Sequence, residues 1–433
     1  MIGRSIHTIY SPFVWTKRML NALSNGVKRG TWYSLYDKVF TKTNLRESAL
    51  SVIDNKGSHG VDQVSVSRYE SHLSHNLNIL QAKLKNSSYE PRSIRRVYIP
   101  KAGTDEKRPL GIPTVCDRIV QTALLNVIEP IFDSTFSNRS FGFRKVLGCK
   151  DALRTAVSEM NSGRMFVVDV DIKSYFDEID HDILMDLIKA KISDGRILNL
   201  IEMFLKQGVM EGIEELDPEK RGSPQGGVIS PLLANIYLNP LDILLESQNL
   251  HLVRYADDFL IMCESQEDAD KALILVKEWM SSVKLRIHPQ KTRIVDMNQV
   301  GHSFEFLGYH FERMKRGCIR RWPKAANMKK FKDKVRYITR RNNPHSIEIV
   351  CEQLHIYFKG WFQYFKHSMH YKFQSLDGFT RRRMRRILKK RRNKKGTGKN
   401  LTDHKAWSNT WFESHGYVSL YSMYEAEFQS LRS

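Results

Sequence analysis

The chain has 433 residues, of which 41% are hydrophobic and 27% are charged. This length and composition exclude a disordered chain and favour two or three folded domains. The formal net charge of +22 is uneven, since residues 320–433 contain 27 basic and 8 acidic residues, whereas residues 1–319 contain 42 and 39. A basic C-terminal quarter predicts a polyanionic partner, and we expect nucleic acid. No run of 18 apolar residues is present, so we expect no membrane partner.

The cysteines indicate the cellular compartment. None of the five forms a C-x-x-C pair, which argues against a structural zinc site and fits a reducing cytosol. They are Cys116, Cys149, Cys263, Cys318 and Cys351. The N-terminus lacks the pattern of a secretory signal.

The first part of the chain reads as mostly helical, followed by a hairpin. Hydrophobic spacing and turn residues predict helices at 45–53, 67–84 and 117–131, a strand at 89–100, a turn at 101–109 and a return strand from 110 to 112.

The middle alternates short strands with helices, and the end is helical. We expect strands at 164–172, 252–262 and 304–311 and helices at 181–188, 232–245 and 269–283; after Pro323 we expect only helices, at 324–342, 345–367 and 371–392. The predicted fold class is therefore α+β, with a largely antiparallel sheet followed by a basic all-α region. The main domain boundary is expected near 315–325.

Two adjacent acids, Asp257 and Asp258, interrupt the apolar run 253–263. Two ionised carboxylates about 4 Å apart repel by roughly 4 kcal/mol at an effective dielectric near 20. A shared proton, a divalent cation between them, or a tight hairpin that turns both toward water would each offset the repulsion.

A second acidic strand favours the cation. Asp171 ends the predicted strand 164–172, and no His or Cys lies nearby in the sequence. Three carboxylates of this kind suit two Mg²⁺ ions, which clamp the attacking and leaving oxygens in phosphoryl transfer. Asp169 lies two residues earlier, and we expect it to have a structural or supporting role.

These segments resemble, in order, the motifs of group II intron-encoded reverse transcriptases, also called maturases. The resemblance runs from about residue 30 to the end. It is carried by IPKAGTDEKRPLGIPTVCDRIVQ (99–121), SFGFRKVLGCKDAL (140–153), DIKSYFDEIDH (171–181), GSPQGGVISPLLANIYLNPLD (222–242), YADD (255–258), HPQKTRI (288–294), FEFLGYHF (304–311), FKGWFQYFK (358–366), LDGFTRRRMRRIL (376–388) and WFESHGYVSLY (411–421).

The resemblance implies a right-hand polymerase fold. The implied domains are an N-terminal extension with fingers (1–165), a palm (166–318), an α-helical thumb (319–392) and a basic DNA-binding region (393–433). A further endonuclease domain, which many relatives carry, is not expected.

The resemblance also implies an RNA-directed DNA polymerase of the bacterial cytosol, associated with RNA and the nucleoid. Such an enzyme binds group II intron RNA, assists its splicing and copies it into DNA during retrohoming. The implied partners are that RNA, an RNA template/DNA primer duplex, target DNA and deoxynucleotides. The protein would be a monomer or a dimer.

The resemblance assigns roles to residues at the carboxylates. Asp171, Asp257 and Asp258, with the Ile172 carbonyl, would bind two Mg²⁺ ions, with Mn²⁺ able to substitute. Phe176 would stack under the incoming sugar and reject a 2′-hydroxyl. Lys291 would protonate the leaving pyrophosphate, although an exposed lysine is equally common as a solvated side chain.

Other residues would hold the nucleotide, the primer and the RNA. Lys101 and Arg108 would bind the triphosphate, unless they merely flank a solvated turn. The loop Pro224, Gln225 and Gly226 would approach the nucleotide. Phe306, Leu307, Gly308 and Tyr309 resemble the primer grip. The tract 381–392 has nine basic residues, and we expect RNA contacts from Arg381, Arg382, Arg383, Arg385, Arg386, Lys389 and Lys390.

Two other functions fit the motifs. One is a related bacterial reverse transcriptase that serves in defence or DNA repair without an intron. The other is a splicing helper with an inactive polymerase site, which the presence of Asp171, Asp257, Asp258, Gln225 and Lys101 disfavours. A ribozyme sequence flanking the reading frame would separate the first from an intron-encoded enzyme.

Overall fold

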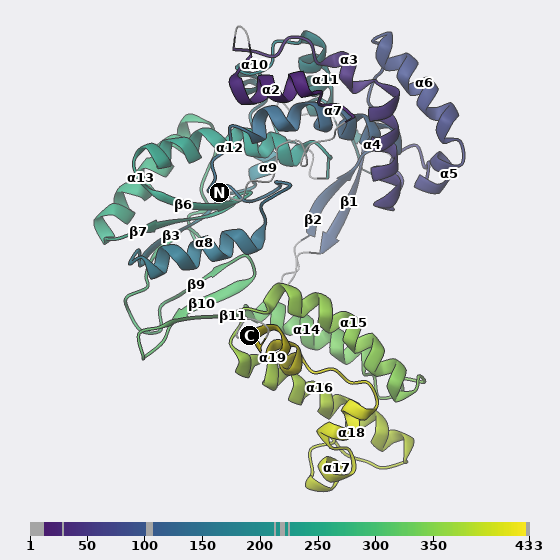
Figure 1. Cartoon of the computed structure of the whole chain (residues 1–433), viewed down its shortest axis with the longest axis vertical. Helices are drawn as coiled ribbons and strands as arrows, with labels where there is room; N and C mark the ends of the chain where they lie inside the picture. Colours follow the sequence, from purple (N-terminus) through teal and green to yellow (C-terminus); the bar gives the residue numbers. More distant parts are fainter. Residues whose placement is uncertain are drawn as a thin grey trace. The chain divides into compact units, whose positions relative to one another are not determined.

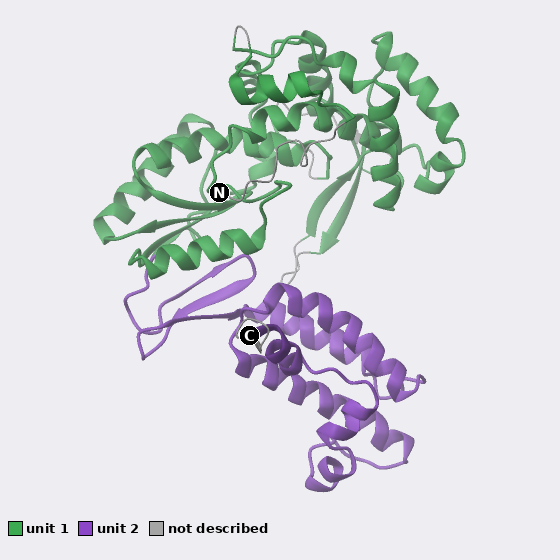
Figure 2. Cartoon of the chain, viewed as in Figure 1, with its two compact units in different colours: residues 1–294 green, residues 295–433 purple. Residues whose placement is uncertain are grey.

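The computed structural model describes residues 13–27, 30–100, 107–211, 214–216, 221–223 and 226–429. The chain divides into two compact units, Met1–Ile294 and Val295–Ser433 (Figure 2). The composition shift near 315–325 therefore lies inside the second unit, and the division into fingers, palm, thumb and C-terminal region stays a prediction.

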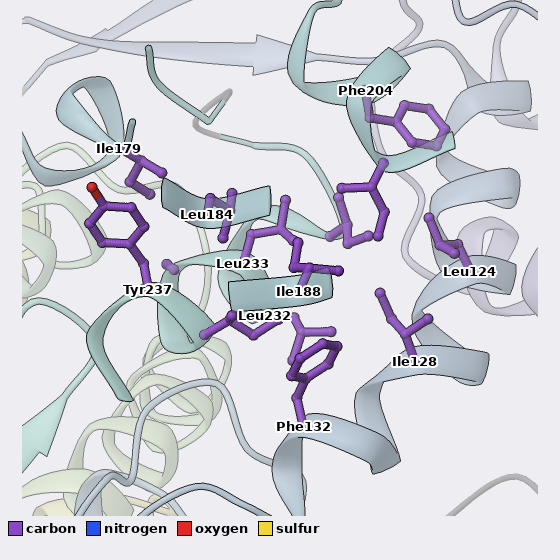
Figure 3. Packing of buried hydrophobic residues seen from close by; sticks show 14 of the residues in the cluster. Leu124, Ile128, Phe132, Ile179, Leu184, Ile188, Phe204, Leu232, Leu233 and Tyr237 are labelled. Atoms are coloured by element: carbon purple, nitrogen blue, oxygen red, sulfur yellow. The ribbon is translucent and has the colours of Figure 1, made fainter. Parts of the chain in front are cut away.

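Unit 1 is built on helices that pack around one core. Its helices are α2 (Lys17–Asn25), α3 (Tyr36–Val39), α4 (Lys42–Asp54), α5 (Val66–Glu70), α6 (Leu73–Lys85), α7 (Val115–Asp133), α8 (Cys149–Asn161), α9 (Tyr175–Glu178), α10 (His181–Lys189), α11 (Gly195–Leu205), α12 (Ser230–Ser247) and α13 (Gln266–Ser282). Figure 3 shows the side chains of α7, α10 and α12 that meet in this core, among them Ile128, Ile188 and Leu233.

The single helix predicted at 67–84 is wrong, since α5 and α6 are separate. The Ser71 hydroxyl donates to the carbonyl of Arg68 (2.8 Å) at the end of α5. A serine that bonds the preceding turn in this way competes with helix continuation.

One sheet of unit 1 is the predicted hairpin extended by two short strands. Its order is β2-β1-β4-β5, with β1 (Ile94–Pro100), β2 (Lys107–Ile112), β4 (Val209–Glu211) and β5 (Glu214–Leu216). β1 and β2 are antiparallel, as the predicted hairpin requires, but β2 begins at Lys107, so Arg108 lies opposite Ile99 in the strand and not in the predicted turn.

A second sheet has the order β6-β7-β3-β8, and Figure 1 labels its first three strands. Its strands are β3 (Phe166–Asp171), β6 (His251–Tyr255), β7 (Asp258–Cys263) and β8 (Arg293–Asp296), which contains the junction between the units. β7 is antiparallel to both β3 and β6. α8 and α13 pack against β7, and Phe259–Cys263 are buried, so this strand is covered on both faces.

The single strand that the hydrophobic pattern predicts at 252–262 is wrong, because β6 and β7 form a hairpin at YADD (255–258), as the resemblance to reverse transcriptases implies. The turn between them is Ala256–Asp257, and Ala256 has φ +60°. A positive φ in a two-residue loop matches the twist of the two strands.

Unit 2 combines a three-stranded sheet with six helices among its described residues. The sheet order is β11-β10-β9, with β9 (Ser303–Phe306), β10 (Tyr309–Arg313) and β11 (Ile319–Pro323), and the helices are α14 (Ala325–Ile338), α15 (Ile347–Phe365), α16 (His370–Arg391), α17 (Leu401–Ala406), α18 (Asn409–Ser414) and α19 (Leu420–Gln429). The single strand predicted at 304–311 is wrong, since it too is a hairpin. The three long helices predicted after Pro323 are confirmed.

The phenylalanines Phe331 of α14 and Phe358 and Phe362 of α15 belong to the hydrophobic core of unit 2. All three are buried there together with Phe373 of α16.

In the part of the chain that the structure describes, no helix has the length and apolar character needed to span a membrane. The predicted α+β class with a helical C-terminal region is confirmed.

Candidate active site

Three carboxylates gather at one edge of the β6-β7-β3-β8 sheet. The register places Asp171 of β3 opposite Asp258 of β7, and Asp258 is also opposite Tyr255 of β6. Directly opposed residues of antiparallel strands have Cα atoms about 4.5–5.5 Å apart. Asp257 lies in the adjoining turn, so all three acids belong to one small region.

The environment of Asp257 disfavours its negative charge. Burial raises the pKa of this carboxyl, and the charge of Asp171 acts in the same direction, whereas the backbone, Arg108 and Arg254 lower it. Asp257 and Asp258 are both half-buried, so the alternative in which the turn directs them fully into water does not hold. A bound cation or a proton is therefore needed at this edge of the sheet to offset the negative charge of the carboxylates.

Lys291 provides one positive charge beside the acids. Its ammonium lies 3.3 and 3.2 Å from the two carboxylate oxygens of Asp171. The preceding chain is anchored to the end of β3, because His288 N–H donates to the Asp171 carbonyl (2.7 Å) and Lys173 N–H donates to the Arg286 carbonyl (2.9 Å). A metal at Asp171 would therefore compete with Lys291 for this carboxylate.

The side chains are not arranged as a closed metal site. Among the described residues, no group of three or more His, Cys, Asp or Glu side chains lies close enough to hold a metal ion. The donor set still fits a divalent cation, because it consists of carboxylates, the ligand type that Mg²⁺ prefers. The raised pKa of Asp257 shows that a positive charge nearby would stabilise this group in its ionised form. Ile172 follows Asp171 directly, and its side chain is buried.

A buried ion pair supports the turn that carries Asp257, and the sequence did not reveal it. Arg254 is fully buried and donates from Nε to Asp242 Oδ1 (2.7 Å), with a second bond from Nη2 to Oδ2. Its Nη1 donates to the Ala256 carbonyl (2.9 Å) and to the Asn235 side chain (3.0 Å). Arg254 therefore holds the carbonyl group of the peptide bond between Ala256 and Asp257 in place. The sequence signal that could have indicated this pair is the presence of Asn235 and Asp242, seven positions apart, in the otherwise mostly apolar predicted helix 232–245.

The turn is also supported by a close backbone contact. A Cβ on Gly142 would lie 2.3 Å from the backbone nitrogen of Ala256, so no other residue fits at this position without movement. Phe141 N–H donates to the Arg254 carbonyl (2.8 Å), and Asn235 Nδ2 donates to the Gly142 carbonyl (2.8 Å). The motif 140–153 thus lies beside the carboxylates.

Asp169 and Phe176 lie near the same edge. The carboxylate of Asp169 is 3.6 Å from the guanidinium of Arg293, and its side chain is mostly buried. Phe176 is partly buried, and its ring packs edge-on against Tyr175, with ring centroids 5.4 Å apart. Its sugar-filter role stays a prediction.

The predicted nucleotide-binding residues are only partly described. Lys101, Pro224 and Gln225 lie outside the described residues. Arg108 is exposed on β2, yet close enough to lower the pKa of Asp257. Gly226 has φ +117°, and a Cβ there would lie 2.2 Å from the Gly111 carbonyl oxygen of β2.

Gln121 was missed by the sequence reasoning and holds the loop before α12. This α7 side chain is buried, and its oxygen accepts from the N–H groups of Val228 (2.6 Å) and Ile229 (3.4 Å). These are donors that the start of α12 would otherwise leave without a partner.

The predicted primer grip is a hairpin turn held by tyrosines in unit 2. Leu307 and Gly308 have φ of +45° and +79°, and Phe306 and Tyr309 are buried. Tyr309 donates its hydroxyl to the Tyr364 carbonyl (2.7 Å), and Tyr364 donates to the Leu307 carbonyl (2.7 Å). Because Phe306 and Tyr309 are buried, the half-exposed turn residues Leu307 and Gly308 would be the ones to contact a primer.

The basic residues of α16 differ in their surroundings. Arg385 is buried and donates to the Trp407 carbonyl (3.0 and 2.9 Å), and Lys389 is buried in an ion pair with Asp403 (2.8 Å). Arg383 donates to the Thr339 carbonyl at the end of α14 (2.9 Å). Of the predicted set, Lys390 is exposed and Arg381, Arg382, Arg383 and Arg386 are half-exposed.

Family models match two parts of the chain. Residues 99–311 match the model described as reverse transcriptase (RNA-dependent DNA polymerase), and residues 328–407 match the group II intron maturase-specific domain. The first match contains the three carboxylates and Lys291, and the second contains the basic residues of α16.

Curated relatives also match this chain. Protein YkfC of Escherichia coli K12 is 34% identical over 311 residues, which cover 62% of this chain and 80% of the relative. The group II intron-encoded protein LtrA of Lactococcus lactis is 33% identical over 303 residues, which cover 55% of this chain and 50% of LtrA, so the chain spans half the length of that relative. A solved chain of a partial Cas6-RT-Cas1–Cas2 complex has 23% identity and a TM-score of 0.38, covering 57% of this chain and 42% of that one.

Proposed function

Because the chain belongs to the group II intron reverse transcriptases and maturases, a family of RNA-directed DNA polymerases, we propose that it copies group II intron RNA into DNA during retrohoming and assists the splicing of that RNA. The observation that carries the proposal is the register that sets Asp171 opposite Asp258, beside Asp257. Its substrates would be an RNA template with a DNA primer, deoxynucleotides and target DNA.

Reverse transcriptases use divalent metal ions, and we propose two Mg²⁺ ions for this chain. Asp171, Asp257 and Asp258, with the Ile172 carbonyl, would hold them. When bound, such ions polarise the phosphate and stabilise the charge that develops on the attacking and leaving oxygens.

The chain's own residues would position the reactants. Arg108 has five guanidinium donors and can orient the triphosphate by bidentate bonds. Lys291 can donate its proton to the leaving pyrophosphate, because its ammonium already lies beside Asp171. The ring of Phe176 would exclude the 2′-hydroxyl of a ribonucleotide.

Metal removal tests the proposal directly. We expect the purified chain to extend a DNA primer on an RNA template with Mg²⁺, to stop when EDTA is added, and to resume when Mg²⁺ or Mn²⁺ is restored in excess. Extension that continues in EDTA would show that the carboxylates serve another purpose.

The salt dependence of RNA binding tests the role of α16. Arg382 and Arg386 are half-exposed and Lys390 is exposed, so their charged groups can reach a phosphate backbone. Replacing Arg382, Arg386 and Lys390 with Gln should lower the slope of log Kd against log salt by about two to three, as three lost phosphate contacts predict. The slope is measured by filter binding of intron RNA over a salt series.

The same charge change elsewhere provides the control. Lys189, Lys206 and Lys271 are exposed on unit 1 helices, and their replacement with Gln should leave the slope unchanged. If both triple variants have the wild-type slope, the RNA binds away from α16.

A further inference from the structure

Phe143 combines two features that are individually uncommon. It has φ +57°, in the left-handed region, and its side chain is 46% exposed. A bulky residue with positive φ is a strained outlier, because its Cβ crowds the backbone. A ring that is nearly half exposed offsets this strain only in part by burial, so folding alone does not account for this residue.

The strained conformation is held from both sides. On one side, the Gly142 carbonyl accepts from Asn235, and the Gly142 backbone lies against Ala256. On the other side, Arg144 donates to the Ser140 carbonyl (3.0 Å) and pairs with Asp133 (2.6 Å). Strain that the surrounding structure enforces in this way is typical of functional sites.

The ring lies beside the carboxylate edge. Its centroid is 6.4 Å from that of Tyr255, with the planes at 42°. Tyr255 is opposite Asp258 in the register and two residues before Asp257. Val146, three residues after Phe143, is also exposed, at 50%. The exposed Phe143 ring therefore adjoins the site where a primer end would react.

We propose that Phe143 contacts the terminal base pair of the RNA template/DNA primer duplex and holds the primer end at the carboxylates. This inference rests on the proposed polymerase function. An aromatic ring suits such a contact, because every base pair offers an apolar face or sugar edge whatever its sequence. The rigid, enforced backbone would keep the ring in place before the duplex arrives.

Replacing Phe143 with Gly separates this role from a structural one. Glycine adopts positive φ without strain, so the thermal midpoint should be no lower than that of the wild type. Loss of the ring should weaken binding of a blunt-ended RNA/DNA duplex about tenfold. Both quantities are measured on the full chain with Mg²⁺, the affinity by fluorescence anisotropy without nucleotide.

Two further variants complete the test. Phe143→Asn also tolerates positive φ and lacks the ring, so it should weaken binding like Phe143→Gly. Tyr33→Ala removes a ring that is 68% exposed elsewhere in unit 1 and should leave the affinity unchanged. Wild-type affinity in either Phe143 variant would overturn the inference. A wild-type chain that extends no primer on RNA would instead overturn the proposed function.

Discussion

Replacing Asp257 with Asn is expected to lower primer extension on an RNA template about a thousandfold or more. The substitution keeps the shape but removes a charged oxygen, and charge stabilisation by the bound metals is worth several kcal/mol in the transition state. The variant should still be folded. Because burial raises the pKa of Asp257, the folded state disfavours the ionised carboxyl, and the neutral Asn should leave the unfolding temperature at pH 7 equal or higher.

The matched control is Asp169→Asn. Asp169 lies on the same strand and pairs with Arg293, so we expect extension within about tenfold of the wild type. Single-turnover extension with saturating primer and nucleotide compares the variants. Near wild-type extension by Asp257→Asn would remove this residue from the metal site.

Replacing Arg254 with Met should be the most destabilising single change near the site. It would leave the Asp242 carboxylate buried without its partner, which costs about 3–5 kcal/mol. Burial already raises the pKa of Asp242, and the Arg254 charge opposes that shift. Urea unfolding followed by circular dichroism measures the loss.

A double variant separates the stability effect from the catalytic one. Arg254→Met with Asp242→Leu removes both charges and should recover most of the stability, since a buried pair is often replaceable by apolar residues. The bond to the Ala256 carbonyl stays lost, so extension should remain below that of the wild type. As a control, Arg154→Met breaks an exposed pair with Asp151 and should cost less than about 1 kcal/mol. A full return of activity in the double variant would show that Arg254 does not position the turn.

Most helices and strands followed from hydrophobic spacing, but two hairpins did not. Both stretches, 252–262 and 304–311, consist mainly of strand-forming residues, and the turns place Ala256 and Leu307 at positive φ, where turn rules expect Gly or Asn. In both cases tertiary contacts fix the turn, through Arg254 and Tyr364.

The carboxylates were predictable because strand ends and adjacent acids are local signals. The register that aligns Asp171 with Asp258 depends on pairing over a long sequence separation, and only the motif resemblance anticipated it. The surroundings of α16 were not predictable either. Its charge is visible in the sequence, but burial of Arg385 and Lys389 depends on the chain from 393 to 407, which folds back over the helix at Gly398 and Asp403.

The most direct test of the metal site is a crystal structure of the full chain with primer-template, a non-reactive deoxynucleotide and Mn²⁺. Anomalous scattering should show two peaks about 3.5–4 Å apart, both within reach of Asp257 and at least one on Asp171, with Lys291 displaced from that carboxylate. An ordered nucleotide with no anomalous peak at these acids, and with Lys291 still on Asp171, would contradict the account.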